Sequence, residues 1–116
     1  MKLLHITIHT DNFEKEITFY LEYAGLHITR DMRPAGREMV FLADKDGDTE
    51  IEIIYDPDAH SAGNQNLSIG FRTDDPDLKR EEMLQCGYDV TPMITPYPHV
   101  RFFFTTDPAG VRVQFM

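Results

Sequence analysis

The sequence repeats itself at an interval of 62 to 63 residues, and this repeat restricts the folds open to the chain. Gly25–Thr29 is echoed by Gly87–Thr91 at an interval of 62 residues, and Val40–Leu42 falls on Phe102–Phe104 at the same interval. Each half shows the same order of patterns, namely strand, helix, strand, strand and strand. Because neither half could bury its sheet alone, we expect the two halves to pack side by side into one curved sheet.

In the first half, Leu3–Thr10 alternates between apolar and polar side chains, which is typical of a strand with one polar face. The polar face of this strand carries His5, Thr7 and His9. The other elements predicted for this half are a helix at Phe13–Ala24 and strands at Leu26–Arg30, Glu38–Ala43 and Asp48–Asp56.

The second half restarts the pattern after a polar segment rich in turn formers, so we divide one domain into module one at 1–56, a linker at 57–66 and module two at 67–116. Asp75 and Pro76 are typical of a helix start, and Pro92–His99 contains three prolines and is predicted to be a loop. The predicted elements are a helix at Pro76–Cys86 and strands at Leu67–Thr73, Tyr88–Thr91, Val100–Thr106 and Val111–Met116.

The strand predicted at Asp48–Asp56 has two chemically different faces. Side chains alternate along a strand, so Glu50 and Glu52 share one face while Ile51 and Ile53 share the other. The isoleucine face requires a hydrophobic core. The glutamate face must meet water, a partner charge or a metal ion, because burying a lone carboxylate is costly.

Composition restricts the classes of partner and the cellular compartment that we expect for this protein. The 116 residues carry a net charge of −9, and no basic patch is visible, so we expect no nucleic-acid partner. Cys86 is the only cysteine, which rules out an internal disulfide and suits a reducing cytoplasm. We find no apolar run long enough for a signal peptide or a membrane span, and therefore expect a cytoplasmic protein with no membrane partner.

Two βαβββ modules in this order resemble the vicinal oxygen chelate superfamily, which includes glyoxalase I, bleomycin-resistance proteins, fosfomycin-resistance proteins and extradiol dioxygenases. The nearest branch resembles bacterial glyoxalase I, or lactoylglutathione lyase. The resemblance covers the whole chain and is carried by Lys2–His5, Ile17–Tyr20 ahead of Gly25, Ile51–Tyr55 and Asp107–Gln114. It implies an α+β fold in which tandem βαβββ modules form a curved, cup-like mixed sheet with helices outside, and it implies a homodimer.

The resemblance also implies a metal site, held in the family by one residue from the first and one from the last strand of each module. Those positions here are His5, Glu52, Ser68 and Gln114, where family members usually show histidine or glutamine, glutamate, histidine and glutamate. A hydroxyl is a poor ligand and an amide a modest one. We therefore expect a degenerate site at His5, Glu52 and Gln114 for nickel, zinc, cobalt, manganese or iron, with a metal-free protein as the open alternative.

Two functions follow from the resemblance. The first is a glyoxalase-like lyase or isomerase acting on a small oxygen-rich molecule in the cavity, with Glu52 anchoring a metal or acting as a base and His5 as a ligand. Without metal, His5 and Glu52 would form a base oriented by a carboxylate. The second is a metal-free protein that binds a drug-like or aromatic molecule, as bleomycin-resistance proteins do. The presence of both His5 and Glu52 favours the first function, whereas the neutral Ser68 and Gln114 favour the second.

Further residues are predicted to line the substrate cavity. Arg72 and Arg112 share the faces of Ser68 and Gln114, so either could bind an anionic group, with a surface ion pair as the alternative. His9 stands where the bacterial enzymes often have arginine, which argues against a glutathione adduct. The predicted cavity residues are Thr7, His9, Ser68, Arg72, Phe103 and Arg112, with core packing as the alternative for Phe103.

Overall fold

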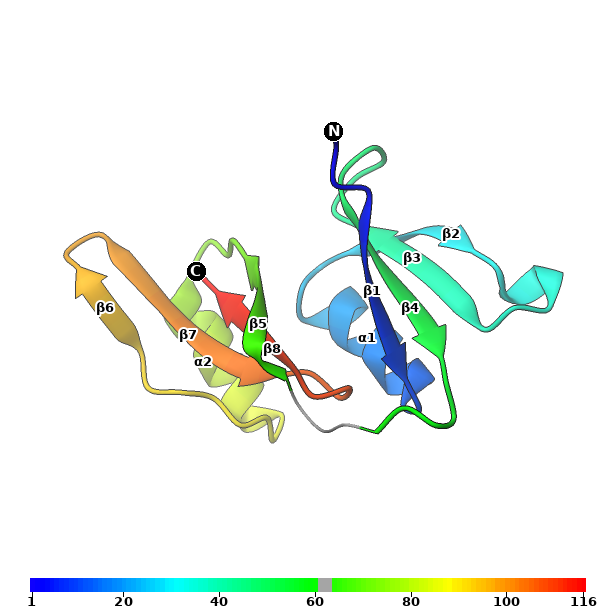
Figure 1. Ribbon diagram of the computed structural model, residues 1–116. Coiled ribbons are helices and arrows are strands. Elements are labelled where there is room, and N and C mark those ends of the chain that lie inside the picture. Colours follow the sequence, from blue (N-terminus) through cyan, green and yellow to red (C-terminus); the bar gives the residue numbers. More distant parts are fainter. Residues whose placement is uncertain (61–63) are drawn as a thin grey trace. The chain divides into compact units, whose positions relative to one another are not determined.

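A computed structural model describes residues 1–60 and 64–116 and divides the chain into two compact units, residues 1–61 and 62–116 (Figure 1). Each unit has one four-stranded mixed sheet with an α-helix. This confirms an α+β fold of two tandem βαβββ modules. Of the linker predicted at 57–66, residues 61–63 lie outside the described residues, and Asn64–Asn66 belong to a strand.

Unit one contains β1 (His5–Thr10), α1 (Phe13–Glu22), β2 (His27–Asp31), the 3-10 helix η1 (Arg33–Ala35), β3 (Met39–Ala43) and β4 (Glu50–Tyr55). The strands are ordered β1-β4-β3-β2, so the first and last strands of the unit are neighbours. They pair in parallel, whereas β3 pairs antiparallel with both β4 and β2. Tight turns such as the one at Gly36, where φ is 81°, require glycine.

Unit two contains β5 (Asn64–Phe71), α2 (Pro76–Gln85), β6 (Ile94–Tyr97), β7 (Val100–Thr106) and β8 (Val111–Phe115). Its strand order, β5-β8-β7-β6, repeats that of unit one, again with the first and last strands in parallel. The predicted helix start is confirmed, because the Asp75 side chain accepts a hydrogen bond from the Leu78 backbone N–H at 3.0 Å and Pro76 opens α2. In the described part of the chain, no helix is long and apolar enough to cross a membrane.

The core of unit one lies between one face of its sheet and α1. Ile51 and Ile53 are buried, as their alternation with the glutamates predicts, and α1 packs against β4 (Figure 1). The helix buries residues at helical spacing on its inner side. The other buried apolar residues of this unit are Ile8, Phe13, Ile17, Phe19, Tyr20, Leu26, Val40, Phe41, Leu42 and Ala43.

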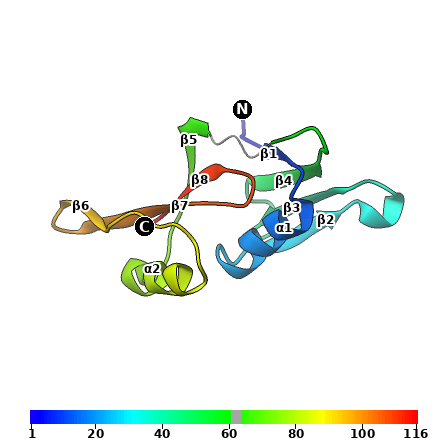
Figure 2. The same ribbon diagram turned by 90° about the horizontal axis from the view of Figure 1, so that it is seen from below.

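The core of unit two is smaller and rich in aromatic rings. Helix α2 lies on one face of its own sheet and packs against β7 (Figure 2), and Met83 is the residue that it buries completely. Phe103 and Phe115 stack with their ring centroids 5.7 Å apart. Ile69 and Val113 complete the buried apolar set.

Phe103 does not lie on the polar face, so core packing, the alternative to its predicted place in the cavity, holds. Its side chain is 0% exposed and packs in the core. The reason is the register of β7. Phe41 pairs with Glu52 in unit one, and Phe104 pairs with Gln114 in unit two, so Phe104 and not Phe103 is the counterpart of Phe41. The repeat interval in this strand is therefore 63 residues rather than 62, and a shift of one residue moves a side chain to the opposite face.

The prediction of a strand at Tyr88–Thr91 is wrong. In the structure, this segment forms only a single bridge, between Val90 and Thr105. The remaining strand of the four-stranded sheet is β6, which lies inside the segment Pro92–His99 that was predicted to be a loop. Strand β6 lies at the edge of its sheet. An edge strand tolerates proline because one side of its backbone needs no hydrogen-bond partner, and this accommodates Pro96.

The register of β7 yields a stability test. Replacing Phe103 by Ala should lower the free energy of unfolding by about 3–5 kcal/mol, because it leaves a cavity against Phe115. The matched change of an aromatic residue in the same sheet, Tyr97→Ala, should cost no more than about 0.5 kcal/mol because Tyr97 is 69% exposed. Urea unfolding followed by circular dichroism measures both. Equal losses in the two variants would contradict the assignment of Phe103 to the core.

Candidate functional site

The parallel pairing of β1 with β4 gathers polar side chains on the side of the unit one sheet that faces away from α1. Thr7 is the register partner of Glu52, and His5 is the partner of Glu50. On β3, Phe41 pairs with Glu52 from the other side. We call these five residues the Glu52 face. The structure thus brings His5, Thr7 and Glu52 together, as the alternation of β1 and β4 predicts.

Glu52 is the most enclosed carboxylate of this face, with 9% of its surface exposed. The Thr7 hydroxyl donates a hydrogen bond of 2.5 Å to Glu52 Oε1, and His5 Nε2 lies 3.9 Å from the same oxygen. Within residues 1–60, no hydrogen bond reaches Oε2. The carboxylate is therefore held through one oxygen while the other is available to accept a proton.

An arginine and an imidazole cover Phe41, which is buried although it lies on the polar face. The guanidinium carbon of Arg30 lies 3.7 Å from the centre of the Phe41 ring, in a cation–π arrangement. The His5 ring meets Phe41 edge-on, with centroids 6.0 Å apart and planes at 75°. These contacts fix the imidazole of His5 beside Glu52.

Glu50 is an ion-paired carboxylate and so meets a partner charge, one of the three environments open to the glutamate face. Arg30 Nη2 donates to Glu50 Oε1 at 2.9 Å, and the Thr29 hydroxyl donates to Oε2 at 2.5 Å. A register shift between Ile28 and Arg30 lets both consecutive residues reach this carboxylate. Burial raises the pKa of Glu50, but the hydrogen bonds from Thr29 and Arg30 outweigh it and leave the pKa below its ordinary value.

His9, predicted to line the cavity, lies on β1 beyond Thr7. Its side chain is 56% exposed, and Nδ1 is 3.9 Å from Asp56 Oδ2. An ion pair this exposed contributes little to stability. His9 is therefore free to meet solutes but is not fixed in the way that His5 is.

In unit two, the structure brings together Ser68, Arg112 and Gln114. Arg112 is the register partner of Ser68, and Gln114 is the partner of Gly70. A Cβ atom at Gly70 would come within 3.2 Å of Gln114 Oε1, so the glycine makes room for the amide. Arg72 lies one residue beyond the end of β5, and its side chain is exposed. It is therefore not part of the strand that carries Ser68.

The donors of unit one do not by themselves fit a catalytic metal centre. His5 Nε2 and Glu52 Oε1 are 3.9 Å apart, whereas two ligands of a tetrahedral zinc ion lie roughly 3.3 Å apart. Catalytic zinc sites use about three protein ligands. Among the residues that the structure describes, no group of three or more histidine, cysteine, aspartate or glutamate side chains could hold a metal ion.

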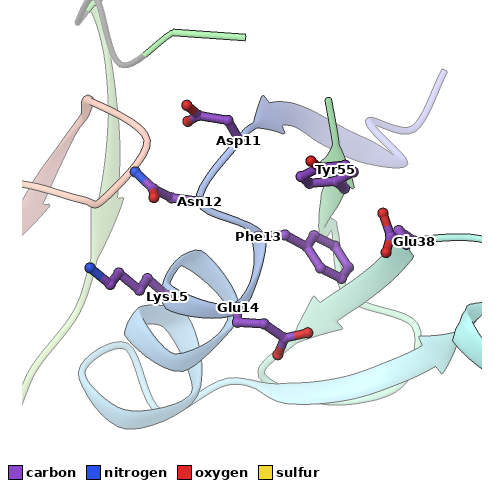
Figure 3. A pocket seen from close by; sticks show the side chains of 7 residues that line it. All are labelled: Asp11, Asn12, Phe13, Glu14, Lys15, Glu38 and Tyr55. Carbon is purple, nitrogen blue, oxygen red and sulfur yellow. The ribbon is translucent and has the colours of Figure 1, made fainter. Parts of the chain in front are cut away.

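Unit one also has an open hollow of about 420 Å³ beside the N-terminus of α1 (Figure 3). The rings of Phe13 and Tyr55 meet there edge to face, with centroids 6.4 Å apart. Its lining contains none of the residues predicted for the site. The residues that line it are Asp11, Asn12, Phe13, Glu14, Lys15, Glu38 and Tyr55.

The fold and the paired first and last strands define a class of protein, and the sequence comparison identifies it. The family model described as Glyoxalase/Bleomycin resistance protein/Dioxygenase superfamily matches residues 2–115. The chain therefore belongs to this superfamily. The resemblance inferred from the two βαβββ modules is confirmed.

Particular relatives come from several branches of the superfamily. A lactoylglutathione lyase of Neisseria meningitidis serogroup A is 27% identical over 124 residues, which span 100% of this chain and 90% of that protein. The trypanothione-dependent glyoxalase I of Leishmania major superposes with a TM-score of 0.78 at 20% identity, covering 100% of this chain and 86% of the other. The antibiotic-binding protein TnmS3 of Streptomyces sp. CB03234 gives 0.72 at 23% identity, covering 99% and 93%. These structural matches establish the fold alone.

The lowered pKa of Glu50 leads to a pH-dependent stability test. Since the folded pKa lies below the ordinary value of 4.5, the ion pair stabilises the fold fully above that value and is lost as pH falls through the folded pKa. Glu50→Gln should lower the free energy of unfolding at about pH 7 by about 1 kcal/mol, with a smaller loss at about pH 3. Urea unfolding at the two pH values measures the loss. A loss independent of pH would show that the charge of Glu50 is not responsible.

Proposed function

We propose that this chain is a glyoxalase-like enzyme, an isomerase or lyase that moves a proton on a small carbonyl compound. The observation that carries the proposal is the state of Glu52. This carboxylate is buried, one oxygen is held by Thr7, and the other is unengaged within unit one. A base that is oriented and partly removed from water is what proton abstraction beside a carbonyl requires.

Each residue of the pair has a definite role in this reaction. In an α-hydroxycarbonyl compound, Glu52 takes the proton from the carbon that bears the hydroxyl and returns it to the former carbonyl carbon. The hydroxyl proton passes to the former carbonyl oxygen, so the enzyme ends in the state in which it began. Thr7 orients the carboxylate. His5, beside the same carboxylate, can donate a hydrogen bond to the substrate oxygen where negative charge develops. No oxidant or reductant is needed.

The relatives suggest which compounds to test first. The Neisseria meningitidis relative is a lactoylglutathione lyase, so methylglyoxal with glutathione is the first pair to assay. The exposed His9, where bacterial enzymes often carry arginine, favours other small carbonyl compounds. A homodimer and a cytoplasmic location stay predictions from the sequence.

The proposal predicts a loss of proton transfer when the base is neutralised. Glu52→Gln should slow exchange of the substrate C–H proton in D₂O, followed by NMR, by about 10²–10⁴-fold, because the amide cannot accept the proton. The control is Glu22→Gln, an exposed glutamate on α1, which should retain full activity. Equal rates for wild type and Glu52→Gln would overturn the assignment of Glu52 as the base.

Metal content provides a separate test of the degenerate site. The protein purified without chelator and dialysed against zinc, nickel, cobalt, manganese or iron should retain less than one equivalent, because His5 and Glu52 are two donors where catalytic sites use about three. Elemental analysis measures it. Stoichiometric metal that is lost in His5→Ala and in Glu52→Ala would instead support a metal-dependent enzyme.

A second candidate function is binding without catalysis. It is favoured by Ser68 and Gln114, the neutral residues at the two positions in unit two where family members usually carry histidine and glutamate. Under this alternative the protein binds a drug-like or aromatic molecule. Two results would distinguish this binding function from the enzyme. The wild-type protein would catalyse no exchange of the substrate C–H proton, and saturable ligand binding would be unchanged in Glu52→Gln.

A further inference from the structure

We propose that unit two has an anion site, in which Arg112 binds the carboxylate of a small apolar acid. The site is formed by Ser68, Phe104, Arg112 and Gln114, which we call the Arg112 face. This proposal goes beyond the proton transfer assigned to Glu52 and does not depend on it. It rests on a comparison of equivalent positions in the two repeats.

The register shows that the polar faces of the two units have opposite charge. Glu52 and Gln114 are equivalent because each pairs with an aromatic residue of the adjacent antiparallel strand, Phe41 in unit one and Phe104 in unit two. Two residues earlier on the same strands, Glu50 is matched by Arg112. Two carboxylates in unit one are thus replaced by a cation and a neutral amide in unit two.

Arginine stacks on the equivalent aromatic ring in both units, but only one of the two arginines is neutralised within its own unit. Arg30 lies 3.7 Å above Phe41 and forms an ion pair with Glu50 at 2.9 Å. Arg112 lies 3.8 Å from the centre of the Phe104 ring. Across residues 66–116, no ion pair engages Arg112. The N–H edge of a stacked guanidinium remains available for a planar carboxylate.

Two other arginines of unit two, Arg101 and Arg80, are already engaged. Arg101 donates two hydrogen bonds to the carboxylate of Asp77, at 2.8 and 2.6 Å. Arg80 Nε donates to the Thr91 carbonyl at 2.7 Å. Arg112 therefore differs from Arg101 and Arg80 in that its guanidinium is stacked on an aromatic ring and has no acceptor within residues 66–116.

The surroundings of Arg112 suit an anion with an apolar body. The sequences of β5, β7 and β8 contain no aspartate or glutamate, so no carboxylate of these strands competes with a ligand. Ser68 and Gln114 flank Arg112 and can donate further hydrogen bonds. Along β7, Phe102 meets Phe104 edge to face at 5.6 Å, which extends an apolar surface beside the guanidinium. A benzoate-like acid combines a carboxylate for the guanidinium with an aromatic ring for the apolar surface.

Titration of the full chain with benzoate, followed by NMR of the ¹⁵N-labelled protein at constant ionic strength, tests this site. Benzamide, which has the same shape without charge, is the comparison ligand. We expect benzoate to shift the Arg112 Nε–H signal and the amides of Ser68 and Gln114, and to bind at least about tenfold more tightly than benzamide.

Variants of Arg112 identify the group responsible. Arg112→Gln should weaken benzoate binding at least about tenfold, and Arg112→Lys should give an intermediate value because it keeps the charge but not the planar fork. The matched control is Arg101→Gln, which removes a guanidinium already bound to Asp77 and should change the affinity less than about twofold. The amide spectrum of each variant shows that it is folded.

Several results would overturn the site. Benzoate could leave the signals of β5, β7 and β8 unchanged, it could bind no better than benzamide, or it could bind folded Arg112→Gln as tightly as the wild type. Loss of proton exchange in Glu52→Gln with benzoate binding intact would support both proposals separately. Benzoate binding that fails while proton exchange persists would remove only the anion site.

Discussion

Parallel hydrogen bonding between the first and last strand of each unit brings together the polar residues of the Glu52 face and of the Arg112 face. In unit one this pairing sets Thr7 beside Glu52, and in unit two it sets Ser68 beside Arg112. A slip of one residue would turn these side chains toward the helix and bring apolar ones to the polar face. The buried isoleucines of β4 oppose such a slip, because exposing Ile53 would cost hydrophobic free energy.

The same strand framework supports two different chemistries through small substitutions. In unit one, the Thr7 hydroxyl donates a hydrogen bond to the carboxylate of Glu52, the residue that we propose as a base. In unit two, the equivalent position is Gly70, which donates nothing from a side chain and leaves space for the amide of Gln114. The repeat thus preserves backbone geometry while the side chains of the two faces have diverged.

The sequence predicts the elements of this fold well wherever a local pattern determines them. Alternation in β1 and β4 predicts that Thr7 and Glu52 share a face, and the repeat predicts the common strand order of the two units. Contacts that depend on a partner strand are not predictable in this way. The register shift that brings Thr29 and Arg30 to one carboxylate has no local signal, and the position of Phe103 changes with a single added residue in the repeat.

The absence of acidic residues from β5, β7 and β8 has a further consequence, because the chain as a whole carries 20 aspartates and glutamates and a net charge of −9. The net charge of the protein repels anions at long range, whereas the site that we propose at Arg112 would attract them at contact. Dissolved salt screens interactions beyond about 8–10 Å more than it screens a hydrogen-bonded pair. Raising the ionic strength therefore weakens the repulsion during approach as well as the attraction at contact. An anion at this face should accordingly be held with an unusually shallow salt dependence for an arginine site.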